Sequence, residues 1–328
     1  MNMAVIDKGN AEMAREELRA RVRTEQTRLG LSQKQIADQA GMSSGTFSTW
    51  LSNTYKGNYE THDVLIVKWL ESCSARSRIR AVRARAPEFV HTHTARKLMA
   101  LMEAAQYGPE LGVVAGAAGV GKTMAAKAYA GQNPNVWIIT ADESMKSAAA
   151  TLIEIEDVLG CASERGSRRV RRVERFLEGR QGLIVIDEAQ FLSTKAIEQL
   201  RSIFDKTQTG IVFMGNAPLN DRFGALGRLP DHAQLFSRID EWEIIKGPVS
   251  QDVDAILDAW GELDSDVREA CRAVAVQQGA LRSMNKVLLK ASTMARVRNA
   301  EVISVDDVKA AWKKHMTGEM PAFRRIAA

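Results

Sequence analysis

The sequence predicts an α/β chain in which a helix-covered parallel sheet lies between two all-helical segments. Residues 111–130 show the pattern of a buried strand, a glycine-rich turn and a helix. Residues 183–188 form a second buried apolar run that ends in two carboxylates. From Ser250 onward, the apolar residues follow only helical spacing. Strands that alternate with helices indicate a parallel sheet, and the helical stretches at both ends indicate separate helical domains.

Composition places the chain among folded, globular proteins. Its 328 residues are enough for two or three domains, and 45% of them are hydrophobic and 26% charged. No apolar run approaches the length of a membrane span and the N-terminus is too charged for a secretory signal, so we expect a cytoplasmic protein without a membrane partner. The three cysteines lack paired spacing, which suggests reduced thiols. The net charge of +5 suits an anionic polymer as partner.

Changes in composition along the chain mark four segments. We expect a helix-turn-helix domain over residues 1–73, a basic linker over 74–87, an α/β core over 88–248 and a helical lid over 249–328. The linker is rich in arginine and contains no acidic residue. Such a segment would add salt-sensitive affinity for nucleic acid by releasing counterions, and a solvated linker is the alternative.

Residues 31–53 have the spacing of a helix-turn-helix. Gly41 marks the turn between two short helices, and Phe47, Trp50 and Leu51 are spaced to pack inward from the second helix. Small polar side chains then face outward, where they can meet phosphates and base edges in a major groove. A helical bundle that does not bind DNA is the alternative. The candidate DNA-contacting residues are Ser44, Thr46, Ser48, Thr49, Asn53 and Lys56.

Two further helices are expected in this first domain. Residues 10–29 show the pattern of one charged amphipathic helix. After residue 54, a loop leads into another helix, in which Val64, Val67 and Leu70 line one face. This second helix would close the domain.

The stretch LGVVAGAAGVGKT, residues 111–123, matches the phosphate-binding pattern G-x-x-x-x-G-K-[ST]. Its glycines let successive N–H groups face one centre, and the following helix adds the positive end of its dipole. Lys122 would reach the β- and γ-phosphates of ATP, and the Thr123 hydroxyl would bind Mg²⁺. A chance glycine turn is the alternative, but the required strand and helix are both present. The expected nucleotide contacts are Gly116, Ala117, Ala118, Gly119, Val120, Gly121, Lys122, Thr123 and Met124.

A run of arginines precedes the second buried strand. Arg168, Arg171 and Arg172 share one helix face with Arg175, because they lie at positions i, i+3, i+4 and i+7. Few acidic residues neutralise this stripe, so we favour contact with a DNA backbone over a solvated helix face. The candidate DNA-contacting arginines are Arg168, Arg169, Arg171, Arg172 and Arg175.

The run QGLIVIDEAQFL, residues 181–192, places Asp187 and Glu188 at the end of a buried strand. Asp187 would hold Mg²⁺, and Glu188 would orient and polarise the attacking water. Asn216 ends the next strand, GIVFMGN, where a polar side chain can sense the γ-phosphate. Carboxylates at a strand end suit attack by water better than transfer to a second substrate, which disfavours a kinase.

Two arginines complete the expected site. Residues 217–234 are rich in Gly and Pro and predict a loop. Arg238 follows it and could reach the γ-phosphate of a neighbouring subunit's ATP, although a surface ion pair with Asp240 or Glu241 is the alternative. Arg282 opens a helix of the lid, from which it could lean back on the phosphates.

The order of these parts resembles the AAA+ ATPases. More narrowly, GTFSTWLSN, YKGN, VIDEAQFL, FMGN, LFSRI and GALR occur in the order typical of the phage Mu transposition B proteins, over nearly the whole chain. The resemblance implies an ATP hydrolase that binds double-stranded DNA without sequence preference and assembles with copies of itself into filaments. It further implies delivery of target DNA to a transposase and stimulation of strand transfer.

The chain departs from this family at two places. Gln190 stands where the family has a different polar residue, and an extension precedes residue 20. We expect neither departure to touch the nucleotide chemistry. The residues alone also fit a helicase loader or replication initiator, and they fit a transcriptional regulator in which the nucleotide is only a switch.

Overall fold

The computed structural model describes residues 3–82, 85–161, 168–227, 237–315 and 318–322. The chain forms two compact units, Met1–Arg83 and Ala84–Ala328. Each unit has its own hydrophobic core. Among the described residues, no helix combines the length and apolar character that crossing a membrane requires.

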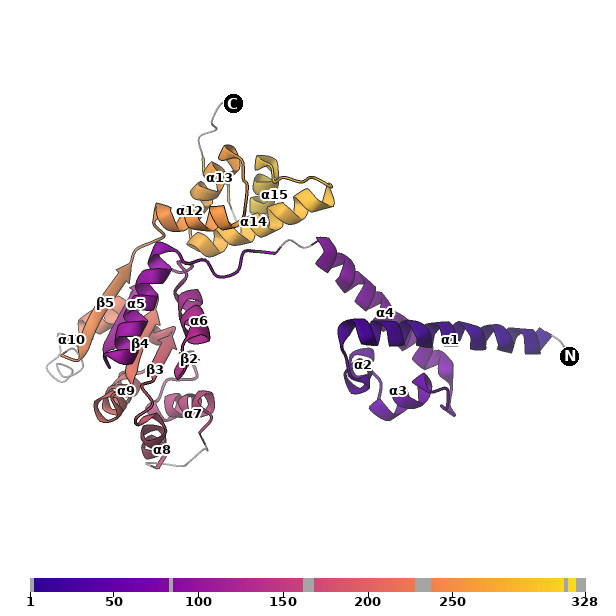
Figure 1. Ribbon diagram of the computed structural model, residues 1–328, viewed down its shortest axis with the longest axis horizontal. Helices are drawn as coiled ribbons and strands as arrows, with labels where there is room; N and C mark the ends of the chain where they lie inside the picture. Colours follow the sequence, from indigo (N-terminus) through magenta and orange to yellow (C-terminus); the bar gives the residue numbers. More distant parts are fainter. Residues whose placement is uncertain (1–2, 83–84, 162–167, 228–236, 316–317, 323–328) are drawn as a thin grey trace. The chain divides into compact units, whose positions relative to one another are not determined.

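The N-terminal unit is all helical (Figure 1). Its helices are α1 (Met3–Leu29), α2 (Gln33–Ala40), α3 (Ser44–Leu51) and α4 (Tyr59–Val82). Helix α1 begins at Met3, earlier than the expected start at residue 10. Helix α4 continues to Val82, so residues 74–82, which we interpreted as linker, are helical.

The buried face of α4 differs from the expected one. Val64 and Val67 are 53% and 40% exposed, whereas only Leu70 of the predicted face is buried. The core instead receives Ile66 and Trp69, which directly precede Val67 and Leu70, together with Leu70 itself. The prediction for Val64 and Val67 was therefore wrong, because their spacing identified a shared face without showing that it is the buried one.

The second unit contains a five-stranded, all-parallel sheet in the order β2-β3-β4-β1-β5. The strands are β1 (Leu111–Gly116), β2 (Val136–Thr140), β3 (Leu183–Asp187), β4 (Gly210–Gly215) and β5 (Ile239–Ile245). Strands β3, β4 and β1 are neighbours, so their C-terminal ends meet at one edge, where ligands bind in such sheets. This arrangement confirms the predicted parallel-sheet core.

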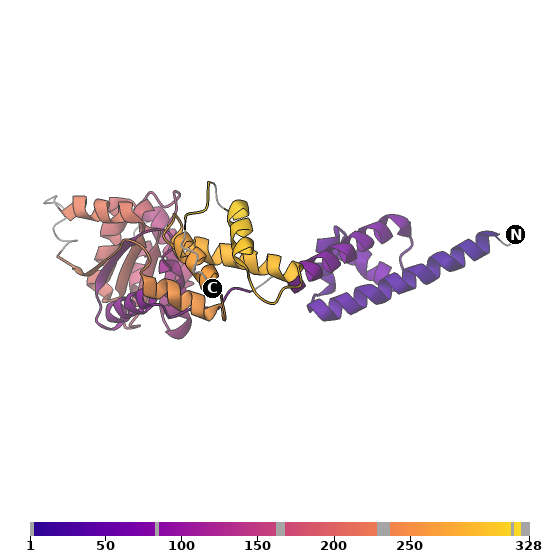
Figure 2. The same cartoon turned by 90° about the horizontal axis from the view of Figure 1, so that it is seen from above.

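Helices cover both faces of the sheet (Figures 1 and 2). Along β1, Val113 contributes to one core cluster and Val114 to the other, because alternate side chains point to opposite faces. Helices α7 to α10 cover the first face, and α5 and α6 cover the second. Their bounds are α5 (His93–Tyr107), α6 (Lys122–Gln132), α7 (Ala148–Leu159), α8 (Arg168–Leu177), α9 (Thr194–Thr207) and α10 (Ala217–Gly227).

Helix α10 corrects the loop expected over 217–234. Residues 217–227 are helical, and 228–236 lie outside the described residues. Pro218 is the second residue of this helix, where a missing N–H removes no intrahelical hydrogen bond. Gly and Pro content therefore gave the wrong prediction for this segment.

The expected helical lid is present after β5 (Figure 1). It packs around its own core cluster, which includes Met284, Val287, Leu288 and Trp312. The lid helices are α12 (Ser250–Ala259), α13 (Ser265–Ala275), α14 (Ala280–Val297) and α15 (Val305–His315). Asp252 of α12 is fully buried and accepts hydrogen bonds from the backbone N–H and hydroxyl of Thr94, which ties the lid to the start of α5.

Candidate functional site

The glycine-rich loop joins the end of β1 to the start of α6. Gly119 and Gly121 have φ angles of 87° and 101°, a left-handed backbone that favours glycine. Lys122 is 8% exposed, and its Nζ donates to the carbonyl oxygens of Gly116 (2.8 Å) and Ala117 (2.9 Å). The loop therefore curls around the ammonium group of Lys122, and the N-terminus of α6 lies at the same place.

Hydroxyl and carboxylate groups meet next to this loop. The Thr123 hydroxyl donates to Asp187 Oδ2 at 2.6 Å, and Asp187 is 3% exposed at the end of β3. Oxygen ligands of this kind suit Mg²⁺, which retains waters and substrate phosphates as further ligands. Burial lowers the pKa of Lys122, and the carboxylates of Glu188 and Asp187 oppose that shift. Strong local charge is thus concentrated at this edge of the sheet.

Three polar side chains form a network beside Asp187. The residue that follows β3, Glu188, has a left-handed backbone (φ 54°, ψ 36°), and a short 3₁₀-helix (Ala189–Phe191) begins after it. Its Oε2 accepts from Gln190 Nε2 at 2.6 Å and from Asn216 Nδ2 at 3.3 Å. The structure therefore brings Glu188 and Asn216 together, and it adds Gln190, which we had expected to be irrelevant to the nucleotide chemistry.

The lid meets the glycine-rich loop directly. The backbone N–H of Arg282 donates to the carbonyl oxygen of Gly119 at 3.3 Å. A Cβ on Gly119 would lie 2.0 Å from the carbonyl oxygen of Gly279, so only glycine allows this approach. The charge of Arg282 also contributes to lowering the pKa of Lys122. Arg282 thus lies close to the loop, on the lid side.

Arg238 has a different environment from the one that we considered. Its Nε lies 2.9 Å from Asp205 of α9, and its side chain is 51% exposed. The ion pair that we considered with Asp240 or Glu241 is therefore made with Asp205 instead. An exposed ion pair of this kind is weak and can be exchanged for another anion.

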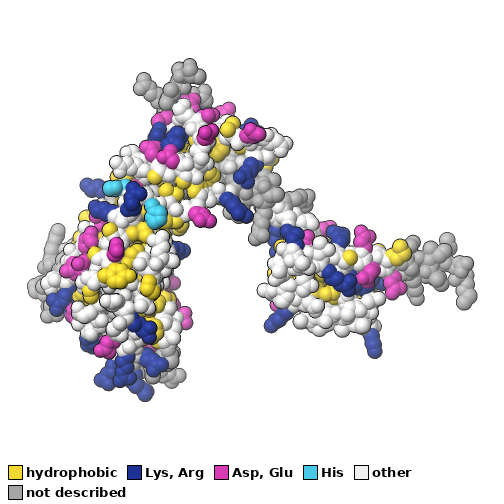
Figure 3. All heavy atoms as spheres, viewed as in Figure 1, with side chains coloured by type: hydrophobic (Ala, Val, Ile, Leu, Met, Phe, Trp, Pro, Cys, Tyr) yellow, Lys and Arg dark blue, Asp and Glu magenta, His cyan; other side chains and the backbone are white. Residues whose placement is uncertain are grey.

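The arginines of α8 divide between two faces. Arg168, Arg171, Arg172 and Arg175 are exposed, and dark blue side chains gather over this helix (Figure 3). Arg169 is the exception. Its Nε lies 2.6 Å from Glu156 of α7, and the two side chains are 14% and 3% exposed.

The position of Arg169 corrects its assignment to the DNA-contacting set. It shares the i, i+4, i+8 spacing of one helix face with Val173 and Leu177, both fully buried, so it belongs to the inward stripe of α8. Its pairing with buried Glu156 fixes α8 against α7. The other four arginines are consequently presented outward.

Two short helices, α2 and α3, joined by a turn, occupy the segment for which we expect a helix-turn-helix. Ser43 caps α3 by accepting from the Thr46 backbone N–H, and Gly41 ends α2 with a left-handed backbone. Phe47, Trp50 and Leu51 are buried, which confirms the predicted inward face. Ser44, Ser48 and Lys56 are exposed, and Thr46 and Thr49 are partly buried.

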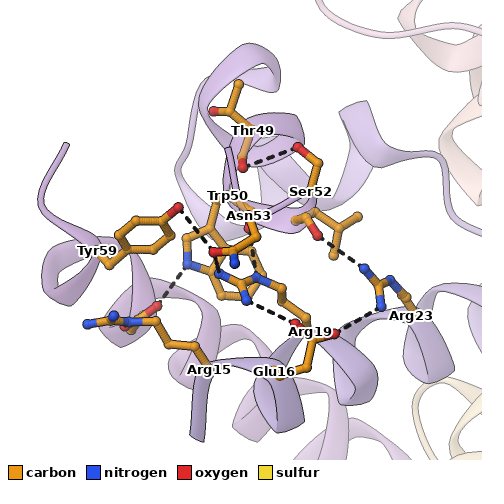
Figure 4. A network of polar contacts seen from close by, with 11 residues as sticks. Arg15, Glu16, Arg19, Arg23, Thr49, Trp50, Ser52, Asn53 and Tyr59 are labelled. Carbon is orange, nitrogen blue, oxygen red and sulfur yellow. Dashed lines mark hydrogen bonds and ion pairs between the residues drawn. The ribbon is translucent and has the colours of Figure 1, made fainter. Parts of the chain in front are cut away.

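Asn53 takes part in a polar network of its own domain (Figure 4). Its backbone is left-handed, with φ 60°, and its Oδ1 accepts from Arg19 Nη2 at 2.6 Å. The Tyr59 hydroxyl donates to the same oxygen at 3.4 Å. Asn53 is exposed, as expected, but its amide oxygen already accepts two hydrogen bonds within the domain, so its assignment as a DNA contact stays a prediction.

An arginine ladder on α1, formed by Arg15, Arg19 and Arg23, secures the C-terminal end of α3 (Figure 4). Arg19 is 1% exposed, and its Nε donates to the carbonyl oxygen of Trp50 at 2.9 Å. Arg23 donates to the carbonyl oxygen of Leu51 at 3.2 Å. The unpaired carbonyls at a helix C-terminus carry partial negative charge, so these guanidinium groups stabilise that end of α3.

The third member of the ladder reaches α4. Arg15 Nε donates to Asp63 at 2.8 Å, and Asp63 also accepts from Trp50 Nε1 at 2.8 Å. Sequence reasoning missed this ladder. Its signal is the spacing of four residues between successive arginines, but that spacing does not distinguish an inward stripe from a solvated one.

Two protein-family models match this chain, and so do several named relatives. The family model described as AAA domain matches residues 105–223, and the model described as Mu B transposition protein, C terminal, matches residues 237–315. The chain is 36% identical over 287 residues to the ATP-dependent target DNA activator B of Escherichia phage D108, a match that covers 87% of this chain and 89% of that protein. The protein of the same name from Escherichia phage Mu is 35% identical over the same shares.

Further similarity extends to a prophage protein and to solved structures. The Mu-like prophage FluMu DNA transposition protein B of Haemophilus influenzae is 32% identical, over 78% of this chain and 90% of that protein. The structure of Cdc6p from Pyrobaculum aerophilum superposes with a TM-score of 0.54 and 18% identity, and covers 72% of this chain and 70% of that chain. At that level of identity, the likeness concerns the fold alone, which is the predicted P-loop core with a helical lid.

Proposed function

Because the chain belongs to the family of the phage Mu transposition B proteins, we propose that it is an ATP hydrolase that binds target DNA for transposition. In this function it forms filaments on double-stranded DNA, delivers the DNA to a transposase and stimulates strand transfer. Target DNA of a phage lies in the host cytoplasm, where we expect the protein to act. The observation that carries the proposal is the meeting of Lys122, Thr123, Asp187, Glu188 and Asn216 at one edge of the sheet.

The nucleotide chemistry is assigned to residues at this edge. The loop from Gly116 to Met124 would hold the phosphates, and Lys122 would exchange its two carbonyl partners for phosphate oxygens. Thr123 and Asp187 would hold Mg²⁺, which when bound neutralises charge on the phosphates. Glu188 would accept the proton of the attacking water.

Three further residues would respond to the γ-phosphate. Asn216 would contact it from the end of β4, and Arg282 would contact it from the lid. Arg238 would exchange Asp205 for the γ-phosphate of a neighbouring subunit, which links hydrolysis to self-assembly.

DNA binding is assigned to two surfaces. The exposed arginines of α8 are placed to contact phosphates, which favours binding without sequence preference. Ser44, Ser48, Asn53 and Lys56 are the exposed candidates of this segment, and Thr46 and Thr49 are partly buried. This outward set supports a second DNA contact in the N-terminal unit.

The test combines Glu188→Gln with electron microscopy on duplex DNA. Without the carboxylate, ATP binds but is not hydrolysed, so the variant should remain on DNA as long filaments when ATP is present. Lys122→Ala is the matched control and should form none. Protection of one short operator without filaments would instead favour a nucleotide-switched regulator, and capture of a replicative helicase rather than a transposase would favour a helicase loader. Wild-type filaments that form equally well without nucleotide would refute the proposal.

A further inference from the structure

We propose that Gln190 is a positioning residue that fixes the carboxylate of Glu188 and links it to the end of β4. This inference rests on the ATP hydrolysis proposed above. Gln190 uses both ends of its amide: Nε2 donates to Glu188 Oε2 at 2.6 Å, and Oε1 accepts from the backbone N–H of Asn216 at 3.3 Å. One side chain therefore bridges two strand ends.

The backbone places Gln190 for this role. The left-handed turn at Glu188 takes the chain away from β3 and starts the 3₁₀-helix that carries Gln190. Gly215, the last residue of β4, leaves the space that the amide occupies. A Cβ on Gly215 would lie 2.3 Å from Gln190 Oε1, so a side chain at this position would displace the amide.

The chemical requirement explains why an amide is used here. Glutamine can donate and accept at once, whereas glutamate can only accept when ionised, and methionine of similar size does neither well. Glu188 Oε2 also accepts from Asn216 Nδ2. Two neutral donors thus hold one oxygen of the carboxylate without cancelling its charge, and this fixes the direction of the other oxygen.

The expected effect is on turnover rather than on binding. A small misplacement of a catalytic group reduces the rate by up to about a hundredfold, whereas contacts with ground-state substrate are untouched. Loss of one of the two donors to Glu188 should therefore lower kcat by roughly tenfold. The KM for ATP and the affinity for a non-hydrolysable ATP analogue should stay within about twofold.

The experiment uses the full chain with Gln190→Met and, separately, Gly215→Ala. The alanine displaces the amide from the opposite side, so both variants should show the same loss of kcat, and the double variant should be no slower than either one. Gly131→Ala is the matched control, because a Cβ there meets no atom within 4 Å. Similar losses from substitutions on two different elements, both of which disturb the same amide, would identify the bridge itself.

A measurement without nucleotide distinguishes loss of the Gln190 bridge from general loss of structure. Exchange of the Asn216 backbone amide, followed by NMR, should accelerate in Gln190→Met because its acceptor is lost. Gln190→Glu keeps an acceptor but loses the donor, so Asn216 exchange should stay slow while kcat falls below that of Gln190→Met, since two carboxylates repel. Unchanged exchange in Gln190→Met would overturn the bridge.

The kinetics of wild type and Gln190→Met distinguish failure of the positioning role from failure of the proposed function. If wild type hydrolyses ATP and Gln190→Met retains kcat within about twofold, or loses affinity for ATP with kcat unchanged, the positioning role is refuted. A higher kcat in Gln190→Met refutes it too, because Gln190 would then restrain Glu188. If wild type itself does not hydrolyse ATP, the proposed function fails instead.

Discussion

Replacing Arg19 by alanine should destabilise the N-terminal unit far more than replacing Arg23, although both arginines belong to the same ladder on α1. The guanidinium of Arg19 donates to the carbonyl of Trp50 and to the amide oxygen of Asn53, and its side chain is 1% exposed. It also lies over the Trp50 ring, 5.6 Å from the ring centroid. The side chain of Arg23 is 54% exposed.

The magnitude follows from this difference in burial. Hydrogen bonds from a charged group contribute about 1.5–3 kcal/mol each, and Arg19→Ala removes the two that Arg19 donates to Trp50 and Asn53. We discount the ion pair with Glu16, because that carboxylate is 58% exposed. Arg19→Ala should therefore cost about 3–6 kcal/mol, and Arg23→Ala less than about 1 kcal/mol.

Hydrogen exchange measured by mass spectrometry on the full chain provides the assay. Peptides from 44–54 should exchange much faster in Arg19→Ala, because the end of α3 loses its partners, whereas peptides from the second unit report any unspecific effect. A domain of this size loses about 4–8 °C of Tm per kcal/mol, so the N-terminal transition should fall by more than about 10 °C. Equal effects of the two substitutions would refute the reasoning.

Three further predictions concern the second unit. Lys122→Ala should abolish ATP binding and hydrolysis, measured by calorimetry and phosphate release, because the main cation at the loop is lost; binding within about twofold of wild type would contradict it. Gly119→Ala should weaken binding of an ATP analogue by about tenfold or more, because its Cβ would lie 2.0 Å from the Gly279 carbonyl oxygen. Gly160→Ala is the control and should leave binding unchanged, because Gly160 also has a positive φ but a Cβ there meets no atom within 4 Å. Arg172→Ala should reduce the slope of log affinity for duplex DNA against log salt concentration by about one. Arg169→Ala should leave that slope unchanged but lower the free energy of unfolding by about 3–5 kcal/mol, because Glu156 would remain buried and unpaired. The opposite pattern would reverse our assignment of the two faces.

Local patterns predicted the parts of the site that are local in the chain. The strand, turn and helix around Lys122 follow from glycine spacing and apolar runs, and the position of Asp187 follows from the end of a buried strand. Because the strands are parallel, their C-terminal ends lie at one edge, and the structure brings Asn216 beside Glu188 as a result.

Contacts between distant segments could not be predicted in this way. Helical spacing showed that Val64 and Val67 share a face, but Ile66 and Trp69 provide the larger apolar surface that becomes buried. Arg169 looked equivalent to its neighbours until its position on the inward stripe of α8 was known. The amide of Gln190 has two partners only because β3 and β4 are paired side by side in the sheet.

The close approach of Gly119 and Gly279 couples the position of the lid to the shape of the glycine-rich loop. Helix α14 starts beside this contact and has 18 residues, so it extends about 27 Å from the loop. A rigid rod of that length turns a tilt of about 5° at its base into a displacement of about 2 Å at its tip. A small movement of the loop would thus produce a larger displacement at the C-terminal end of α14, which precedes α15.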